Sequence, residues 1–367
     1  MSLIVDAHED IASNMLAYGR DYAKSAQAIR SQEAGGPIEQ ATGVAMLGLP
    51  NWLEGGIAVI FGTLFTAPER WRADPFGKNY STPNEAHRLA RQQIDIYQRL
   101  ADEQPQFKLI LTRSDLGAVL KTWDGYSPPA SPDEIKGTDP RQIGIVMLME
   151  NADPIRTPEE VELWYERGLR LIGPAWAATR YCGGTNEPGP LTDDGVRLLK
   201  AMNNLNLILD TSHMDERAFF QALDRYDGPV IASHANPRAL TDDINRHLSD
   251  DMLKALIAKD GVIGTVIYNR FLLRGWAKGD PKDAANVGHV VRAIDYVCQK
   301  AGDARHAAIG SDFDGGFGLQ STPAGFDTVA DLKIIGPALK ERGYSAADID
   351  LILNGNWLRV LRSALPA

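Results

Sequence analysis

Several histidines and acids in this chain stand where short apolar runs end, and their side chains are common ligands of transition metals. His8 and Asp10 follow the first run, and Glu150 closes the run at residues 145–149. His213 and His234 each follow an apolar run and a small hydroxyl residue. Neutral imidazole and carboxylate together suit a borderline metal such as zinc. These residues therefore predict a metal site.

The spacing of these residues indicates how ions could be shared. His8 and Asp10 are two residues apart, so in an extended strand both side chains point to the same side. Glu150 follows five apolar residues, so its carboxylate would lie against hydrocarbon and would need a partner. That partner could be an arginine at the strand end or a metal. With one oxygen to each of two ions, Glu150 would bridge them. Alone, each histidine is more often a core residue or a helix cap, but the repeated pattern favours a metal site.

A glycine-rich segment near the end of the chain supplies two further acids. Asp312 and Asp314 lie in the sequence Ser-Asp-Phe-Asp-Gly-Gly at 311–316, where glycine lets the backbone approach a ligand closely. Such a turn could also bind calcium or simply close a loop. Its position after the last apolar run favours a place in the active site, and we expect residues 311–327 to form a long loop there.

Short apolar runs alternate with amphipathic stretches, the pattern of buried parallel strands covered by helices. The predicted helices include residues 85–100, 191–203, 215–223 and 248–259. The eight predicted strands are residues 3–7, 57–65, 143–149, 169–172, 205–209, 229–232, 262–267 and 307–309. A doubly wound open sheet would explain the alternation as well, but the potential ligands that follow the strands favour a barrel, whose strands end at one face.

The predicted fold is therefore an α/β (β/α)8 TIM-like barrel that forms one domain over residues 1–367. An apolar run at 107–111 and a Pro/Gly-rich stretch at 124–140 interrupt the rhythm between strands two and three, and we interpret them as an insertion. The residues after the eighth strand leave room for C-terminal helices.

Composition limits the partners and the location. The formal charge of −10 argues against binding to a phosphate backbone, so we expect a small-molecule substrate and no nucleic acid. The two cysteines, Cys182 and Cys298, are too few for a disulfide framework and indicate a cytoplasmic protein. The first residues lack a signal-peptide pattern, although a leader could have been removed, and the last lack a membrane-anchor pattern. A homodimer is possible.

The other four histidines carry weaker signals. We assign His87 and His306 to surface or capping roles. His247 and His289 could instead contact the metal ligands and help to orient them.

As a set, these motifs resemble the renal (membrane) dipeptidase family, peptidase family M19 of the amidohydrolase superfamily. The resemblance also includes Leu-Thr-Asp-Asp-Gly at 191–195, Asp-Thr-Ser-His at 210–213, Arg-Gly-Tyr-Ser at 342–345 and Asn-Gly-Asn-Trp-Leu-Arg-Val at 354–360. It implies a dipeptidase with two zinc ions in a (β/α)8 barrel.

The resemblance also implies a role for each ligand. His8 and Asp10 would hold one zinc ion, His213 and His234 would hold the other, and Glu150 would bridge the two. Asp312 would be the acid beside the bridging water, which makes it the catalytic residue.

Substrate contacts follow from the same resemblance. Arg246 would bind the free carboxylate of the substrate, and Tyr268 would lie near it. The family places a histidine after the fourth strand, facing the scissile carbonyl, where this chain has Trp176. An indole can donate one hydrogen bond but cannot carry a proton, a change worth roughly 10²-fold in rate.

Three functions remain open on the sequence alone. The first is hydrolysis of dipeptides by a metal-bridging hydroxide. The second, prompted by Trp176, keeps the hydrolase but changes the substrate to another small amide, a lactam or an ester-bearing acid. The third is a catalytically silent barrel that binds a small molecule, although such a protein would have no physical reason to keep six metal-site residues together.

Overall fold

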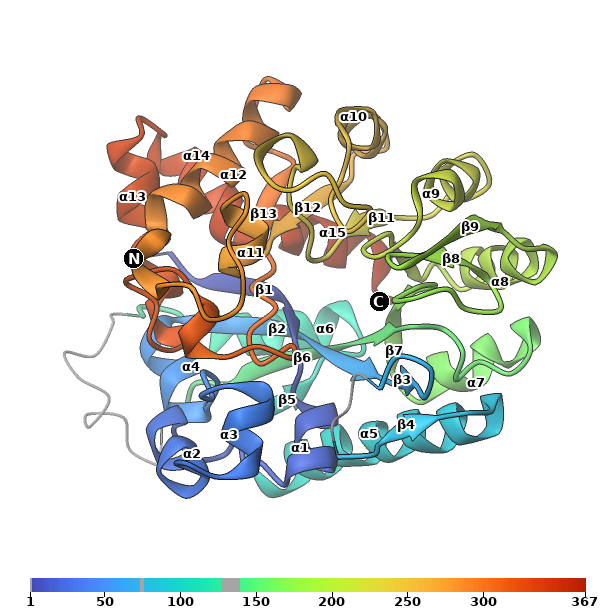
Figure 1. Cartoon of the computed structure of the whole chain (residues 1–367), viewed down its shortest axis with the longest axis horizontal. Helices are drawn as coiled ribbons and strands as arrows, with labels where there is room; N and C mark the ends of the chain where they lie inside the picture. Colours follow the sequence, from blue (N-terminus) through green and yellow to red (C-terminus); the bar gives the residue numbers. More distant parts are fainter. Residues whose placement is uncertain (1, 73–75, 127–138) are drawn as a thin grey trace.

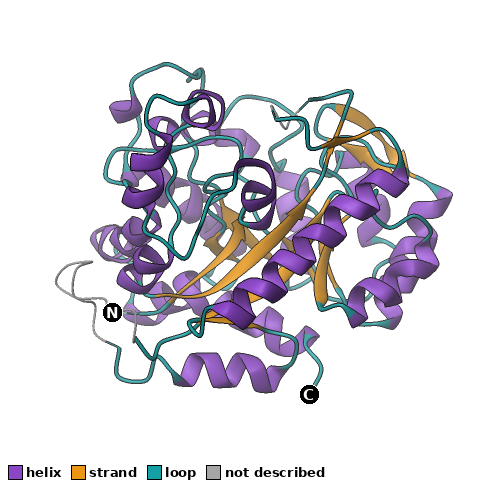
Figure 2. Cartoon of the chain, turned by 90° about the horizontal axis from the view of Figure 1, so that it is seen from below, coloured by secondary structure: helices purple, strands orange, loops and turns teal. Residues whose placement is uncertain are grey.

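A ring of parallel strands forms the centre of the computed structural model, which describes residues 2–72, 76–126 and 139–367 (Figures 1 and 2). The strands pair in parallel and in chain order, which confirms the predicted (β/α)8 architecture. They are β1 (Ile4–Glu9), β2 (Ile57–Phe65), β6 (Ile143–Glu150), β7 (Leu169–Gly173), β10 (Ile208–Asp210), β11 (Val230–Ala232), β12 (Val262–Thr265) and β13 (Ala307–Ile309).

The strands are buried on both faces, which explains their continuous apolar sequences. Every residue of β1 and β6 is buried, and only Phe65 at the end of β2 is partly exposed. A strand covered by helices on one side and by the barrel interior on the other has no polar face. Figure 2 shows the strands crossing the middle of the molecule with helices packed around them.

The barrel is nearly closed, and the seam lies between β1 and β13. Glu9 forms a parallel bridge with Phe313, and the amide of Asp312 donates a hydrogen bond to the carbonyl of His8 at 3.1 Å. The amide of Ser311 donates to the Asp6 carboxylate at 2.7 Å. These contacts join the first and last strands, so the open sheet is excluded.

The helices lie outside the ring. In chain order they are α1 (Ala12–Tyr18), α2 (Ala26–Glu33), α3 (Pro37–Thr42), α4 (Leu49–Gly55), α5 (Pro83–Glu103), α6 (Arg113–Lys121), α7 (Val161–Glu166), α8 (Asp193–Asn204), α9 (Glu216–Leu223), α10 (Asp250–Ala258), α11 (Asn269–Leu272), α12 (Val287–Ala301), α13 (Ile335–Glu341), α14 (Ala346–Asp350) and α15 (Asn356–Ala364). The four predicted helices match α5, α8, α9 and α10 with small changes at their ends.

The last helix, α15, is one of the expected C-terminal helices, and it packs against the barrel strands β1, β12 and β13. Trp357 is fully buried, and its indole N–H donates a hydrogen bond to the carbonyl of Ile309 at 2.8 Å. The indole also packs edge-on against Phe61 of β2, with ring centroids 5.4 Å apart. One side chain thus joins the helix to two strands.

The region between strands two and three differs from the prediction. The apolar run at 107–111 contributes a strand of the main sheet, β5 (Phe107–Leu109), which pairs in parallel with the first residues of β6. The last residues of β6 pair instead with β7, so the long strand β6 serves two neighbours on one side. Of the stretch at 124–140, residues 127–138 lie outside the described residues.

Several strand boundaries also shift, and the first predicted strand, 3–7, extends to Glu9. The predicted strand at 205–209 begins later, at Ile208, because Asn206 adopts a positive φ of 51° and turns the chain after α8. The predicted strand at 262–267 ends at Thr265. Four helices, α1 to α4, fill the connection between β1 and β2, which no pattern in the sequence indicated.

Two short strand pairs lie outside the main sheet. β3 (Ala67–Pro68) pairs with β4 (Asn79–Tyr80), and β8 (Cys182–Gly184) forms an antiparallel hairpin with β9 (Glu187–Leu191). Within the described residues, no helix is long and apolar enough to cross a membrane.

Candidate metal centre

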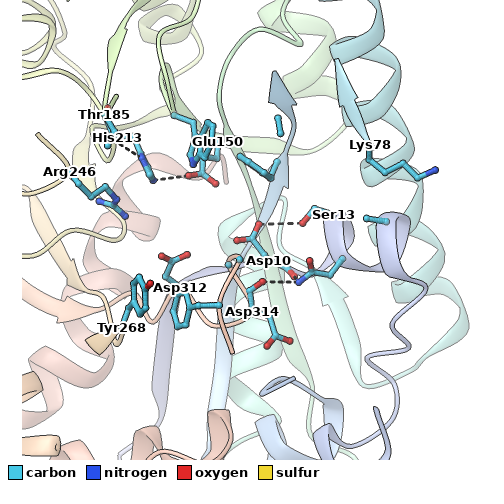
Figure 3. A pocket seen from close by; sticks show the side chains of 18 of the residues that line it. Asp10, Ser13, Lys78, Glu150, Thr185, His213, Arg246, Tyr268, Asp312 and Asp314 are labelled. Carbon is cyan, nitrogen blue, oxygen red and sulfur yellow. Dashed lines mark hydrogen bonds and ion pairs between the residues drawn. The ribbon is translucent and has the colours of Figure 1, made fainter. Parts of the chain in front are cut away.

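All six predicted metal-site residues meet at the carboxyl ends of the barrel strands. None of their side chains is more than 12% exposed. The residues come from five strand ends: His8 and Asp10 from β1, Glu150 from β6, His213 after β10, His234 after β11 and Asp312 after β13. Figure 3 shows several of them facing one another across the pocket.

One group of potential ligands lies between β6, β10 and β11. The Nε2 atom of His213 lies 3.0 Å from Oε1 of Glu150, and that of His234 lies 3.5 Å from the same oxygen. The two Nε2 atoms are 3.0 Å apart. Two imidazoles and one carboxylate oxygen thus point at one small volume, which a metal ion could occupy.

A second group lies on the β1 side of the same glutamate. Nε2 of His8 is 3.5 Å from Oε2 of Glu150 and 3.8 Å from Oδ2 of Asp10. Oδ1 of Asp312 lies 3.8 Å from the same nitrogen. The two oxygens of Glu150 therefore face different groups, which is the arrangement that a bridging carboxylate requires.

The residues fit divalent cations chemically. Both ring nitrogens of His8 are buried and lack a hydrogen-bond partner within the described part of the chain. Burial, reinforced by nearby carboxylates, raises the pKa of Asp10 to about 6 and that of Asp312 to about 8. Acids crowded together away from water need a positive charge, and a divalent metal supplies it.

The histidines are prepared to bind through Nε2. Burial lowers the pKa of His213 to about 4 and also lowers that of His234, so both rings are neutral near pH 7. The hydroxyl of Thr185 lies 2.9 Å from Nδ1 of His213, and the hydroxyl of Ser233 lies 2.7 Å from Nδ1 of His234. Such contacts fix the orientation of a ligating imidazole.

The loop after β13 is held by its second acid. Asp314 is buried, and it accepts hydrogen bonds from the hydroxyl of Tyr22 and the amide of Met46, both at 2.9 Å. Arg20 lies 3.3 Å from the same carboxylate. The Asp314 carboxylate therefore holds the loop in place. Of the two acids, only Asp312 faces the candidate metal ligands.

A pocket of about 310 Å³ opens beside the metal-site residues. Arg246 lines it with only 4% of its surface exposed, and neither terminal nitrogen of its guanidinium has a hydrogen-bond partner among the described residues. Tyr268 lines the pocket as well and stacks on Phe317, with ring centroids 4.4 Å apart. An unpaired buried guanidinium can bind a carboxylate.

Trp176 lines the pocket close to the metal-site residues. Its ring centroid lies 6.4 Å from that of His213 and 5.4 Å from that of Phe65, which it meets edge-on. The side chain is half-buried, and it places hydrocarbon beside one of the candidate ligands.

The remaining histidines correct part of the sequence interpretation. His87 and His306 are buried, and each hydrogen-bonds a backbone carbonyl through Nδ1, so the proposed surface roles were wrong. His289 belongs to the capping box of α12 and does not line the pocket. His247 is buried beside Phe271, with ring centroids 4.9 Å apart, and neither of its ring nitrogens has a hydrogen-bond partner among the described residues.

Sequence reasoning missed several supporting residues. Thr185 lies between β8 and β9, in a hairpin that contacts His213. No pattern in the sequence predicted this hairpin. Asp210 accepts hydrogen bonds from both the amide and the hydroxyl of Ser233. The repeated hydroxyl before each histidine was a usable signal for Ser233. Nothing in the sequence pointed to Arg20.

Comparisons with known proteins agree with this geometry. The family described as membrane dipeptidase (peptidase family M19) matches residues 1–365. An uncharacterized protein in the pqqA 5′ region of Klebsiella pneumoniae is 35% identical over 213 residues, 56% of this chain and 75% of the relative. Dipeptidase aclJ of Aspergillus oryzae is 25% identical over 366 residues, 98% of this chain and 77% of the relative.

Solved structures share the whole architecture. The metallo peptidase from Rhodobacter sphaeroides, liganded with a phosphinate mimic of the dipeptide L-Ala-D-Ala, has a TM-score of 0.77 and 22% identity. The match covers 99% of this chain and 100% of that chain. The probable dipeptidase PvdM from Pseudomonas aeruginosa also has a TM-score of 0.77, with 22% identity over 99% of this chain and 96% of that one.

Proposed function

Because the chain belongs to the membrane dipeptidase family, peptidase family M19, and is a metal-dependent hydrolase, we propose that it cleaves the amide bond of dipeptides at a two-zinc centre. The observation that carries this proposal is the position of Glu150. Its two oxygens face separate ligand groups, one with His213 and His234 and the other with His8 and Asp10. A carboxylate in that position can bind two ions, one through each oxygen.

Zinc ions, when bound, would supply a water-derived nucleophile at neutral pH and polarise the amide carbonyl. The mixture of imidazole and carboxylate ligands suits zinc, and other first-row divalent metals accept the same ligands. Thr185 and Ser233 would hold the two imidazoles so that Nε2 stays directed at the ions.

Asp312 would move the proton. Its carboxylate faces the ligand group at 3.8 Å from His8, and burial raises its pKa to about 8. It can therefore accept a proton from the attacking water and hand it to the departing nitrogen as the C–N bond breaks. One carboxyl group would act first as base and then as acid.

Arg246 would bind the C-terminal carboxylate of the substrate. The unpaired guanidinium nitrogens are buried at the edge of the pocket, so a carboxylate there would form strong, desolvated hydrogen bonds. Tyr268 lines the pocket on the same side as Arg246 (Figure 3). Anchoring the carboxylate would fix the distance to the scissile bond and select short substrates over long ones.

The test is metal analysis combined with a dipeptide assay. We expect about two zinc ions per chain after gentle purification, and hydrolysis of dipeptides that stops on chelation and returns with zinc. Fewer than one tightly held ion would contradict the two-metal centre. A metal-loaded protein that cleaves no dipeptide would favour the second candidate, another small amide, lactam or ester-bearing acid, for which the presence of Trp176 is the supporting observation.

Arg246→Gln tests the substrate's orientation. The wild type should prefer a free dipeptide to the same dipeptide with an amidated C-terminus, and the variant should lose most of that preference, roughly 10²-fold. An unchanged preference would remove Arg246 from carboxylate binding.

Location and assembly stay proposals. We propose that the protein acts in the cytoplasm on a small-molecule substrate, because two buried free cysteines suit a reducing compartment. A homodimer is compatible with this proposal, and a measurement of mass in solution would test it.

A further inference from the structure

The pocket has two ends of different character, and the metal-site acids lie between them. Figure 3 shows Arg246 and Tyr268 on one side of Glu150 and Asp10, with Ser13 and Lys78 on the other. If Arg246 holds the carboxylate, the acyl half of the substrate must lie at the end formed by α1, α5 and the end of β2.

That second end is mostly hydrocarbon. We name it the apolar wall, and its lining residues are Leu16, Ala17, Phe65, Ala67, Leu89 and Trp176. Leu16 of α1 packs against the small cluster that contains Leu89 of α5, and Phe65 meets Trp176 edge-on at 5.4 Å. Because Trp176 also lies near His213, the wall begins directly beside a candidate metal ligand. A bulky apolar group placed there would lose little solvation and gain burial.

Within the described residues, the four acids that line the pocket are already engaged and do not offer a partner for a substrate ammonium at this end. Asp10, Glu150 and Asp312 belong to the ligand groups. Asp314, the fourth acid in the lining, already accepts hydrogen bonds from Tyr22 and the amide of Met46.

Among the described residues, the other polar side chains at this end carry no negative charge that could pair with an ammonium. Gln93 uses both ends of its amide on the backbone of Phe65. Asn14 donates to the carbonyls of Asp10 and Asp314. Lys78 is a cation, so it gives an ammonium no opposite charge. Burying an α-ammonium against the apolar wall without a partner of opposite charge would be costly.

We propose that the acyl half of the substrate is a bulky apolar group that needs no α-amino group, so that the enzyme hydrolyses N-acyl amino acids as well as dipeptides. The inference rests on the proposed function and names its substrate class. Water adds its oxygen to the acyl carbon, the C–N bond breaks and the nitrogen takes a proton. The products are a carboxylic acid and a free amino acid, with no oxidant or other co-reactant.

Matched substrates test the proposal. Phe-Ala is compared with 3-phenylpropanoyl-alanine, and Leu-Ala with 4-methylpentanoyl-alanine, because each pair differs only in the α-amino group. With the zinc-loaded protein, we expect kcat/KM for the acyl compound to be within about 10-fold of that for the dipeptide, or higher. A loss of about 100-fold or more in both pairs would overturn the proposal.

The two hypotheses fail in different ways. If the dipeptides are cleaved and the acyl compounds are not, the proposed function stands and the present inference falls. If neither class is cleaved by zinc-loaded protein, both fall. If only the acyl compounds are cleaved, the inference stands and the dipeptidase activity is wrong.

Variants of the apolar wall provide a second test, a ratio of kcat/KM values for two substrates. A general structural defect would lower both values and leave the ratio unchanged. Trp176→Ala should lower the ratio of kcat/KM for 3-phenylpropanoyl-alanine to that for acetyl-alanine by about 10-fold, and Trp176→Phe should restore most of it. Leu89→Ala, in the α5 part of the apolar wall, should lower the same ratio. Val196→Ala, at an exposed position of α8, is the matched control. If neither wall variant changes the ratio, the apolar wall does not contact the acyl group.

Discussion

At the scale of single residues, Glu150 has the most demanding position, because it serves both ligand groups at once. Glu150→Gln keeps the shape of the side chain but removes its charge and one strong ligand oxygen. We expect bound metal to fall from about two ions to fewer than one per chain, and turnover to fall with it. Metal content after dialysis and kcat on a dipeptide measure the two effects. The control is Glu162→Gln at an exposed site. Normal metal content with normal turnover would remove Glu150 from the centre.

Asp312 gives a different expectation, since its proposed task is proton transfer. Asp312→Asn keeps a similar volume but cannot take up a proton. We expect kcat to fall by about 10² to 10⁴-fold with little change in KM. Metal content measured on the same sample separates this effect from loss of an ion. Turnover within about 10-fold of wild type, with metal retained, would mean that another group carries the proton.

At the scale of elements, α15 is the part whose packing is most easily tested. Trp357→Ala removes a fully buried indole and should lower the free energy of unfolding by about 3 to 5 kcal/mol. Trp357→Phe should cost less, because it keeps an aromatic ring beside Phe61 and loses only the hydrogen bond to Ile309 and part of the ring volume. Urea unfolding followed by circular dichroism measures both. Leu351→Ala, at an exposed position, should change little; a similar value for Trp357→Ala would contradict the role assigned to α15.

Elements were predictable from the sequence where the signal was a local pattern. The eight strands are continuous apolar runs, and the ligands could be placed because they follow those runs directly. By contrast, β5 looked like an insertion, since only its pairing with the first part of β6 makes it a strand of the main sheet. The support of His213 by Thr185 depends on a hairpin that folds back over the barrel, and no spacing along the chain encodes that contact.

At the scale of the whole molecule, stability should depend on pH through a buried histidine that is not a ligand. Burial, assisted by the charge of Arg246, lowers the pKa of His247 to about 3. The unfolded chain takes up this proton near pH 6.5, whereas the folded chain takes it up only near pH 3. The unfolded state therefore binds more protons between these values, and the free energy of unfolding falls as pH is lowered below about 6.5.

His247→Phe removes this contribution and allows a direct comparison. Between about pH 7.5 and pH 4.5, the metal-free variant should lose about 2.7 kcal/mol less stability than metal-free wild type. Urea unfolding at the two pH values provides the measurement. Metal-free samples are needed because protonation of His8, His213 and His234 would otherwise release the ions. Equal losses in the two proteins would show that His247 is already charged or already solvated in the folded state.

The seam of the barrel also bears on how the protein is made. The hydrogen bond from Ser311 to Asp6 spans 305 positions, and the ligand groups lie on both sides of the seam. A ribosome that adds about 5 to 20 residues per second would need roughly 15 to 60 s between the synthesis of His8 and that of Asp312. During that time the nascent chain holds early ligands whose partners do not yet exist. The complete ligand set must therefore assemble late in synthesis or after release, so a prematurely terminated chain would be unable to form the intact centre.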